Sequence, residues 1–387
     1  DGWFDSGSTH FAAMKKDQGF WPATMYLEGL DQYRGWFQSS LLTAVGAFGE
    51  GAPFKECVTH GWTVDGEGRA MHKSLGNGVD PADIFNENGA DILRLWAASA
   101  DYHADVRCSK AIFQQLSQNY LKFRNTCKFM LDNLVDFDPA HLTKAEDMPV
   151  LDRWLITKLN ELIEKVEQSY NDYEFHIITH AVNDFCVTTL SSFYLDIVKD
   201  RLYCEAADSA ERRSAQTALY LTLSTLAKLF APILAFTCDE IWLAMPHTAE
   251  DDARNVVLND MNKPFTAYAL DAETMARWEH IIEVRTAVNG ALEEARAAKV
   301  IGKSLEADVH LTVPEGDVFL ADENPAALAD LFIVSKVELA VGGELAVKVG
   351  NAAGTKCPRC WKHSLTPNAE GLCPRCAEVV RHLPDLL

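Results

Sequence analysis

The sequence has no long apolar run, although 48% of its 387 residues are hydrophobic. No stretch approaches the roughly 18 uninterrupted apolar residues that mark a membrane-spanning helix, so we predict no membrane partner. A signal peptide is also missing, and the first residue is Asp1 rather than methionine. We therefore expect the chain to begin within a longer protein, as a fragment or a processed product.

Positive charge is scarce in this sequence. Lysine and arginine number 35 against 56 aspartate and glutamate residues, which gives a formal charge of −21. This balance argues against a simple basic nucleic-acid binder, although local patches decide contacts with phosphate. Internal repeats and low-complexity tracts are absent as well. Charge alone therefore leaves the partner open.

Most of the ten cysteines are isolated from one another in the sequence. Six are scattered singly in apolar or helical surroundings: Cys57, Cys108, Cys127, Cys186, Cys204 and Cys238. Scattered thiols suit a reducing compartment better than a disulfide framework. We therefore predict a cytoplasmic protein.

The other four cysteines form two knuckles, Cys357-Pro-Arg-Cys360 and Cys373-Pro-Arg-Cys376. Two Cys-x-x-Cys knuckles separated by a short loop have the spacing of a tetrahedral thiolate site, most often filled by Zn²⁺. The last thirty or so residues hold too few apolar groups to fold alone, so the metal would supply much of their folding energy. Two redox pairs or four unrelated cysteines are the alternatives.

The apolar pattern changes character along the chain, and the length predicts two to four domains. Residues 1–100 resemble mixed α/β structure, with strands at 54–60 and 62–64 and a helix at 90–100. Helical periodicity then predicts an antiparallel bundle with helices at 108–134, 151–170, 174–204, 209–231 and 233–245. After a polar connection, a helix at 273–298 precedes strand-like segments at 307–313 and 333–349. Within 151–170 the predicted apolar stripe comprises Leu155, Ile156, Leu159, Leu162, Ile163 and Val166.

One short loop has the composition of a phosphate-binding segment. Met71-His72-Lys73-Ser74-Leu75-Gly76-Asn77 follows a Thr-Val-Asp-Gly-Glu-Gly turn. A lysine, a hydroxyl and a glycine just after strands suit nucleotide phosphates. Taken alone, such a loop is more often simply solvated.

Other segments give this loop a context. They are Trp3-Phe-Asp-Ser-Gly7, Glu28-Gly-Leu-Asp-Gln32, Ala90-Asp-Ile-Leu-Arg-Leu-Trp96, Ser192-Phe-Tyr-Leu-Asp-Ile197 and Cys357-Pro-Arg-Cys-Trp361. In this order, they resemble class I aminoacyl-tRNA synthetases, most closely the bacterial-type isoleucyl branch.

The resemblance implies a multidomain fold. Residues 1–104 would be the C-terminal part of a Rossmann-like α/β class I catalytic domain that carries the phosphate loop. Residues 105–272 would be an α-helical anticodon-binding bundle. Residues 273–350 would be a helix with a small α/β connector, and 351–387 a zinc module held by four cysteines.

The resemblance also assigns the site residues. Lys73 would be catalytic within an ATP phosphate loop of Met71, His72, Lys73 and Ser74. The aminoacyl-adenylate would be bound by Glu28, Gly29, Asp31 and Gln32, for which helix-capping is the alternative role. Trp3, Trp36 and Phe37 are expected in the core.

The implied reaction joins isoleucine to ATP with Mg²⁺, forming isoleucyl-adenylate, and then transfers the acyl group to tRNA(Ile), in a monomeric enzyme.

Two departures from the family pattern bear on activity. Ala70 and His72 stand where the family usually has lysine and serine, which should slow adenylation without abolishing it. The family's histidine-x-glycine-histidine string is absent, so we expect no aminoacylation by this chain alone. A non-catalytic tRNA-binding module is the main alternative function, and a zinc ribbon that docks other proteins is a third.

Several basic and aromatic residues are candidates for RNA contact, because single-stranded RNA is read by stacking and by base-edge hydrogen bonds. Those in the bundle and the zinc module are Arg201, Tyr203, Arg212, Arg213, Arg359, Trp361 and Arg375. A solvated polar face is the alternative. The segment 301–304 resembles the end of a P-loop, but Ala297 replaces the required glycine and no strand immediately precedes it, so we reject that motif.

Overall fold

The computed structural model describes residues 2–14, 19–317, 320 and 325–383. The chain divides into two compact units. Unit 1 comprises Asp1–Tyr120 and Ser169–His180, and unit 2 comprises Leu121–Gln168 and Ala181–Leu387. Among the helices in the described ranges, none has the length and apolar content that crossing a bilayer requires. The four-part division predicted from the sequence stays a prediction.

Unit 1 is built on a parallel strand pair, as the α/β prediction requires. Strand β1 (Ala23–Gly29) pairs with β2 (Phe54–His60) in a register that runs from Ala23 opposite Phe54 to Gly29 opposite His60. Parallel neighbours need a crossover connection, and helix α3 (Trp36–Leu42) lies within it. The unit also contains α1 (Gly2–Gly7), α2 (Thr9–Ala12), β3 (Thr63–Val64), α4 (Pro81–Asn88), α5 (Ala90–Ser99) and β4 (Val106–Arg107).

The core beside β1 is aromatic. Tyr26 and Phe37 are buried, and Trp36 stacks on Tyr26 with 4.5 Å between ring centroids. The core prediction for Trp3 was wrong, because this side chain is 50% exposed. Its ring lies near Gly35, where an added Cβ would approach it to 3.2 Å. The short helix α1 therefore leaves the other side of the indole in solvent.

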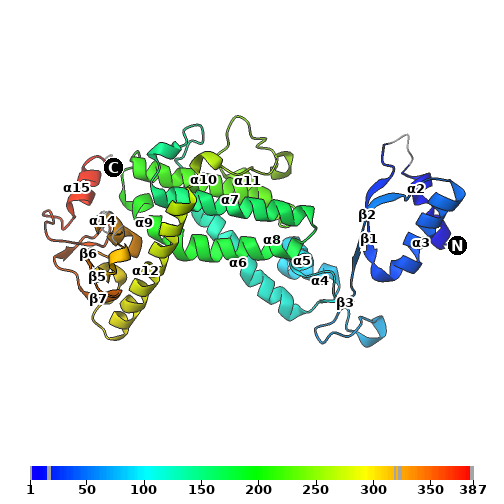
Figure 1. The fold of residues 1–387 in the computed structure, drawn as a ribbon, viewed down its shortest axis with the longest axis horizontal. Helices are drawn as coiled ribbons and strands as arrows, with labels where there is room; N and C mark the ends of the chain where they lie inside the picture. The colour runs from blue at the N-terminus through cyan, green and yellow to red at the C-terminus, as the bar shows by residue number, and fades with distance from the viewer. Residues whose placement is uncertain (1, 15–18, 318–319, 321–324, 384–387) are drawn as a thin grey trace. The chain divides into compact units, whose positions relative to one another are not determined.

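Unit 2 contains most of the helical bundle (Figure 1). The bundle helices within it are α9 (Leu195–Cys204), α10 (Ala210–Phe230) and α11 (Ala235–Ala244), with most of α7 (Val150–Asn171) and parts of α6 (Lys110–Asp132) and α8 (Phe175–Asp184). The predicted stripe on α7 is confirmed, since all six of its side chains are at most 5% exposed. The predicted helix at 174–204 contains a π-helical stretch, Phe185–Tyr194, which apolar periodicity does not reveal.

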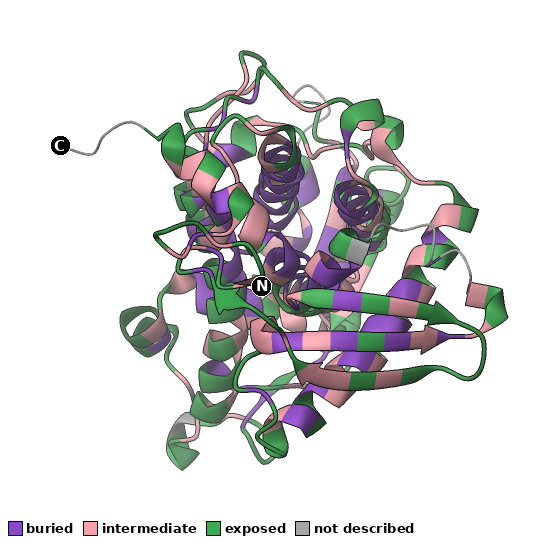
Figure 2. Ribbon diagram, turned by 90° about the vertical axis from the view of Figure 1, so that its left-hand side faces the viewer, coloured by how far each residue is buried: buried purple, intermediate pink, exposed green. Residues whose placement is uncertain are grey.

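A small sheet follows the long helix α12 (Ala272–Ala297). Strand β5 (Ala307–Val313) is central, parallel to β6 (Lys336–Val341) and antiparallel to β7 (Ala346–Asn351), with α14 (Pro325–Phe332) before β6. Alternate residues of β5 are buried, as the colouring of this sheet in Figure 2 shows. The strand-like segment predicted at 333–349 is two strands, because Gly342 and Gly343 turn the chain at φ values of +119° and +100°.

The C-terminal module consists of a short hairpin and one helix. Strands β8 (Thr355–Lys356) and β9 (His363–Ser364) are antiparallel, and α15 (Pro374–Arg381) follows. Gly354 has a φ of +95°, and a Cβ there would lie 2.3 Å from the carbonyl oxygen of Ser364. The hairpin therefore requires glycine at this position.

Candidate active site and metal centre

The acidic set predicted to bind the adenylate lies where β1 ends. Glu28 and Gly29 are the last residues of β1, and Asp31 and Gln32 lie in the 3-10 turn Leu30–Arg34 that follows. Ligands of open α/β sheets bind beyond the carboxyl ends of the strands. A Cβ at Gly29 would lie 2.8 Å from Oδ1 of Asp31. Glycine therefore allows the Asp31 carboxylate to fold back over the strand end.

The side chains of this set differ in whether they form hydrogen bonds within the protein or face solvent. The Gln32 amide donates to Oδ2 of Asp31 at 3.1 Å, and its oxygen accepts from the backbone N–H of Trp36 at 3.2 Å. Gln32 thus holds the start of α3, which matches the helix-capping alternative. Glu28 and Asp31 are exposed, so their carboxylates face solvent.

The phosphate loop follows β3 in the same unit. Its residues Lys73–Leu75 form a 3-10 turn, and the side chain of Lys73 lies outside the described part of the structure. His72 and Ser74 are exposed. Met71 packs instead against the buried cluster of Ile84, Ile92, Cys108 and Phe113. The loop is therefore anchored at its start and open at its tip.

The four knuckle cysteines converge in unit 2, as their spacing predicts. Cys357 and Cys360 lie between β8 and β9, Cys373 precedes α15, and Cys376 lies in its first turn. All four sulfurs lie within 4.8 Å of one another, and none of the four is in a disulfide. This geometry confirms a cluster that could hold a metal ion.

The sulfur spacing fits a tetrahedral thiolate site. A Zn–S bond of about 2.3 Å places the corners of a tetrahedron about 3.8 Å apart. Cys360 Sγ and Cys373 Sγ are separated by 3.8 Å. Burial alone would raise the pKa of Cys357, but the backbone N–H groups of Cys360, Cys373 and Arg359 outweigh it and lower that pKa to about 6. One ligand is thereby favoured as a thiolate.

Two arginines join the metal centre to the end of α9. Arg375 pairs with both carboxylate oxygens of Asp200, at 2.5 and 2.8 Å, and with Glu205 at 2.8 Å. Arg359 donates to the backbone carbonyls of Cys204 and Tyr203 and lies 3.7 Å from the sulfur of Cys376. Both arginines were candidates for RNA contact, and the structure places them in the docking of the module.

Comparison with known proteins agrees with this arrangement. Residues 1–109 match the family model for class I tRNA synthetases (I, L, M and V), and residues 152–311 match the anticodon-binding domain of tRNA ligases. The isoleucine–tRNA ligase of Moorella thermoacetica is 47% identical over 99% of this chain and 43% of its own length. That of Desulforamulus reducens is 48% identical over 98% of this chain and 43% of its own.

This chain belongs to the class I tRNA synthetases, in the isoleucine branch. It spans less than half the length of these curated relatives. A solved LeuRS of Agrobacterium radiobacter K84, in a ternary complex with tRNA and LeuAMS, shares the fold. That likeness has a TM-score of 0.52 at 15% identity, over 86% of this chain and 32% of the other.

In this synthetase chain, the bundle arginines are used within the protein. Arg201 contacts the fully buried carboxylate of Asp152 at 3.2 Å. Arg212 forms two hydrogen bonds to Asp136, at 2.6 and 2.9 Å, and Arg213 lies 3.4 Å from the same carboxylate. A solvated face was the alternative to RNA contact, and the structure instead pairs all three arginines with carboxylates.

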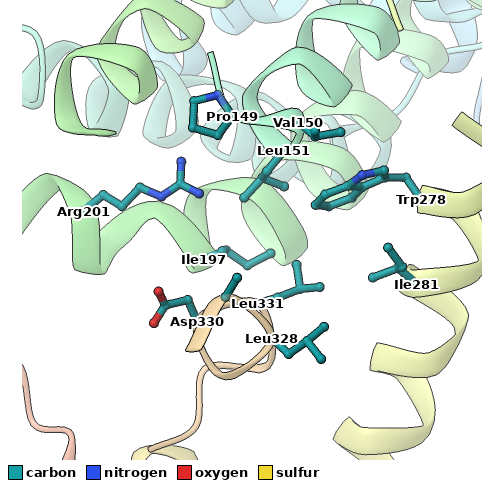
Figure 3. Close-up of a pocket in the computed structure, with 11 residues that line it drawn as sticks. Pro149, Val150, Leu151, Ile197, Arg201, Trp278, Ile281, Leu328, Asp330 and Leu331 are labelled. Carbon is teal, nitrogen blue, oxygen red and sulfur yellow. The ribbon is translucent and has the colours of Figure 1, made fainter. Parts of the chain in front are cut away.

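Arg201 also borders a cavity of about 180 Å³ (Figure 3). Apart from Arg201 and Asp330, its walls are apolar and come mainly from α7, α9, α12 and α14, including Leu151, Ile197, Trp278, Ile281, Leu328 and Leu331. Small-molecule sites usually occupy about 300–1,000 Å³. We therefore assign this cavity to packing between the bundle and the small α/β region.

The aromatic candidates of the synthetase remain accessible. Tyr203 and Trp361 are 56% and 53% exposed, and both line a cavity of about 450 Å³ between α9 and the metal module. The ammonium of Lys303 lies 5.3 Å from the centre of the Trp361 ring. Sequence analysis gave no role to Lys303 or to Cys204, which packs against the metal cluster. Long-range contacts of this kind leave no local signal.

Proposed function

We propose that this chain is the C-terminal part of an isoleucine–tRNA ligase and forms one wall of its adenylate site. The observation that carries the proposal is the placement of two sets in unit 1. Glu28, Gly29, Asp31 and Gln32 lie at the end of β1, and Met71 to Ser74 lie in the loop after β3. Both positions suit a nucleotide bound beyond the carboxyl ends of parallel strands.

In this function an oxygen of the isoleucine carboxylate attacks the α-phosphorus of ATP in line. The bond from that phosphorus to the β-bridging oxygen breaks, and pyrophosphate leaves. Lys73 stabilises charge on the phosphates, which is worth about 10²–10³ in rate for one donor. The exposed carboxylates of Glu28 and Asp31 accept hydrogen bonds from the substrate ammonium or the ribose hydroxyls. Mg²⁺ enters with ATP and neutralises part of the phosphate charge.

We propose Zn²⁺ as the ion of the four-cysteine centre. Four thiolates with one 3.8 Å sulfur separation suit a closed structural site, in which all four positions belong to the protein. A bound ion would join the β8–β9 knuckle to the start of α15. Cys357, Cys360, Cys373 and Cys376 would therefore hold the module in the shape that docks on α9.

The bundle and the metal module would bind tRNA(Ile). Tyr203 and Trp361 are exposed aromatic side chains on which unpaired bases can stack. Base stacking on an aromatic side chain is worth about 1–3 kcal/mol. The cation of Lys303 beside Trp361 adds attraction for phosphate. We further propose a monomer that acts in the cytoplasm, in keeping with ten cysteines that form no disulfide.

The deciding experiment uses the full-length product of the gene that encodes this chain. We expect isoleucine-dependent pyrophosphate exchange and charging of tRNA(Ile), both reduced about 10²–10³-fold by Lys73→Ala. The matched control is Lys55→Ala, an exposed lysine on β2. No isoleucine-dependent exchange by the full-length product would refute the ligase assignment.

A second experiment addresses the alternative, a tRNA-binding module without chemistry. A gel shift of residues 1–387 compares tRNA(Ile) with an unrelated tRNA at two salt concentrations. Preference for tRNA(Ile) that is weakened by Trp361→Ala supports the proposed RNA surface. Equal, salt-labile binding to both tRNAs refutes specific recognition by this chain.

A further inference from the structure

The phosphate loop is closed at its base by one side chain, that of Asn77. Its amide oxygen accepts from the backbone N–H of His72 at 2.9 Å, and its amide nitrogen donates to the carbonyl oxygen of Ala70 at 3.1 Å. Asn77 therefore bridges the two ends of the loop that carries Lys73. Gly76, at a φ of +62°, turns the chain back toward this bridge.

The orientation of the Asn77 amide is fixed by a second residue, Asp65. The Asn77 nitrogen also donates to Oδ2 of Asp65 at 2.9 Å. Asp65 is only 6% exposed and accepts from the backbone N–H groups of Glu67 and Arg69, at 3.0 and 2.9 Å, and from Nε of Arg69 at 2.9 Å. A carboxylate accepts but cannot donate, so it must face the nitrogen of the amide rather than its oxygen. The amide oxygen is thereby directed to His72.

The remaining contacts place this bridge between a fixed base and an open tip. Met71 packs into the apolar cluster beneath α4 and α5, whereas Leu75 is 66% exposed. The tip has one internal hydrogen bond, from Leu75 N–H to the carbonyl of His72, among those described for it. The Asp65–Asn77 pair consequently sets the path of the loop backbone from Ala70 to Asn77.

We propose that Asn77, oriented by Asp65, is a positioning residue for adenylation that holds the backbone of the phosphate loop in its ATP-binding arrangement. The inference rests on the proposed function. Neither side chain touches the substrate. They act through the His72 amide and the Ala70 carbonyl, which lie just before the residue that bears the ammonium. Releasing this bridge lets the loop sample other paths and misplaces the ammonium in the transition state.

Hydrogen exchange on residues 1–387 tests the bridge without any activity. In Asn77→Ala, we expect the amide of His72 to exchange at least tenfold faster, because its only described acceptor is removed. The matched control is Asn86→Ala, an exposed asparagine on α4, with no change in the loop. Unchanged exchange at His72 in Asn77→Ala would overturn the proposal.

A charge exchange tests the role of Asp65. Asn77→Asp alone places a second carboxylate against Asp65 and should speed exchange in the loop at least as much as Asn77→Ala. Adding Asp65→Asn restores one donor–acceptor pair, so the double variant should exchange more slowly than Asn77→Asp alone. An additive double variant would show that the two side chains are not coupled, which also overturns the proposal.

Kinetics of the full-length enzyme separate positioning from simple loss of stability. We expect Asn77→Ala to lower kcat for pyrophosphate exchange roughly tenfold, the equivalent of one to two hydrogen bonds, with KM for isoleucine unchanged. Equal losses in Asn77→Ala and Asn86→Ala, or a changed isoleucine KM alone, contradict the positioning role. If wild-type enzyme shows no exchange activity but the His72 amide responds as expected, the ligase assignment fails while the bridge stands.

Discussion

We predict that removing the metal unfolds the C-terminal module. The hydrocarbon side chains in its small cluster are those of Leu372, Ala377 and Val380, and of these only Leu372 is buried while the other two are partly buried. Burying one Leu or Val contributes about 1.5–3 kcal/mol, so this cluster supplies about 5 kcal/mol at most. Structural zinc supplies about 10–16 kcal/mol in small domains. The proposed ion would therefore dominate the stability of the module.

The loss should be local. Arg375 and Arg359 reach α9 only while the knuckles and α15 are folded. We expect chelation to lower protection against hydrogen exchange across 355–381 to near that of an unfolded chain. Helix α10, with an almost continuous run of buried residues, should keep its protection. The unfolding should follow the metal content measured by elemental analysis.

Variants sharpen this assay. Cys373→Ser removes one ligand and should reproduce the effect of the chelator, with bound zinc falling well below one per chain. Cys57→Ser is the matched control, because Cys57 is an exposed thiol on β2. Metal-free protein in which α15 stays protected would refute the reasoning, since the apolar cluster would then suffice. Absence of bound metal from protein that is purified without chelators would refute the site itself.

Three further predictions concern the loop and the bundle. In the full-length enzyme, Ala70→Lys with His72→Ser should accelerate pyrophosphate exchange, and an unchanged rate would show that these positions are irrelevant. Asp152→Ala should lower the free energy of unfolding in denaturant by about 3–5 kcal/mol, because it leaves Arg201 unpaired and half-buried. The control is Asp132→Ala, which removes the exposed ion pair of Asp132 with Lys128 and should cost less than about 1 kcal/mol. The Arg212 guanidinium beside Asp136 lowers the pKa of that carboxyl to about 2. Its stabilisation is therefore present above the ordinary pKa of about 4 and is lost as pH falls toward 2. The stability gap between wild type and Asp136→Asn should close over that range, and a gap that persists at pH 2 would contradict the pairing.

Much of the fold is predictable because it depends on local periodicity. The apolar stripe of α7 and the helices at 210–230 and 272–297 follow from spacing within single segments. The convergence of the four cysteines was equally predictable from the sequence, because two Cys-x-x-Cys knuckles separated by a short loop allow few geometries. The π-helical stretch Phe185–Tyr194 was not predicted, because the apolar pattern of a helix does not show whether its backbone hydrogen bonds are of the α-helical or the π-helical type.

The location of the candidate site stays a prediction from the sequence, whereas the hydrogen bonds that support its loop could not be predicted. Asp65 and Asn77 both stand in segments that the sequence singles out, yet their contact spans twelve positions through a turn and a loop. Nothing in the residue types shows that an asparagine amide bonds back to Ala70 and His72. Gln32 accepts a hydrogen bond from the backbone N–H of Trp36 at the start of α3, in line with the helix-capping alternative, while its role toward an adenylate stays a prediction.

The arginines show why residue type alone misleads about RNA contact. In a chain with 21 more acidic than basic residues, an arginine has many carboxylates within reach, and a carboxylate fixed in the same fold competes at no cost of association. Arg201, Arg212 and Arg375 each meet such a partner, and Arg375 meets two. Arg201 and Arg212 are held within the bundle, and Arg375 holds the metal module against the end of α9. All three guanidinium groups are therefore poorly placed to leave for phosphate. Recognition by this chain should therefore depend on its exposed aromatic rings, so Trp361→Ala should weaken tRNA binding selectively, whereas Arg375→Ala should weaken it only by releasing the module.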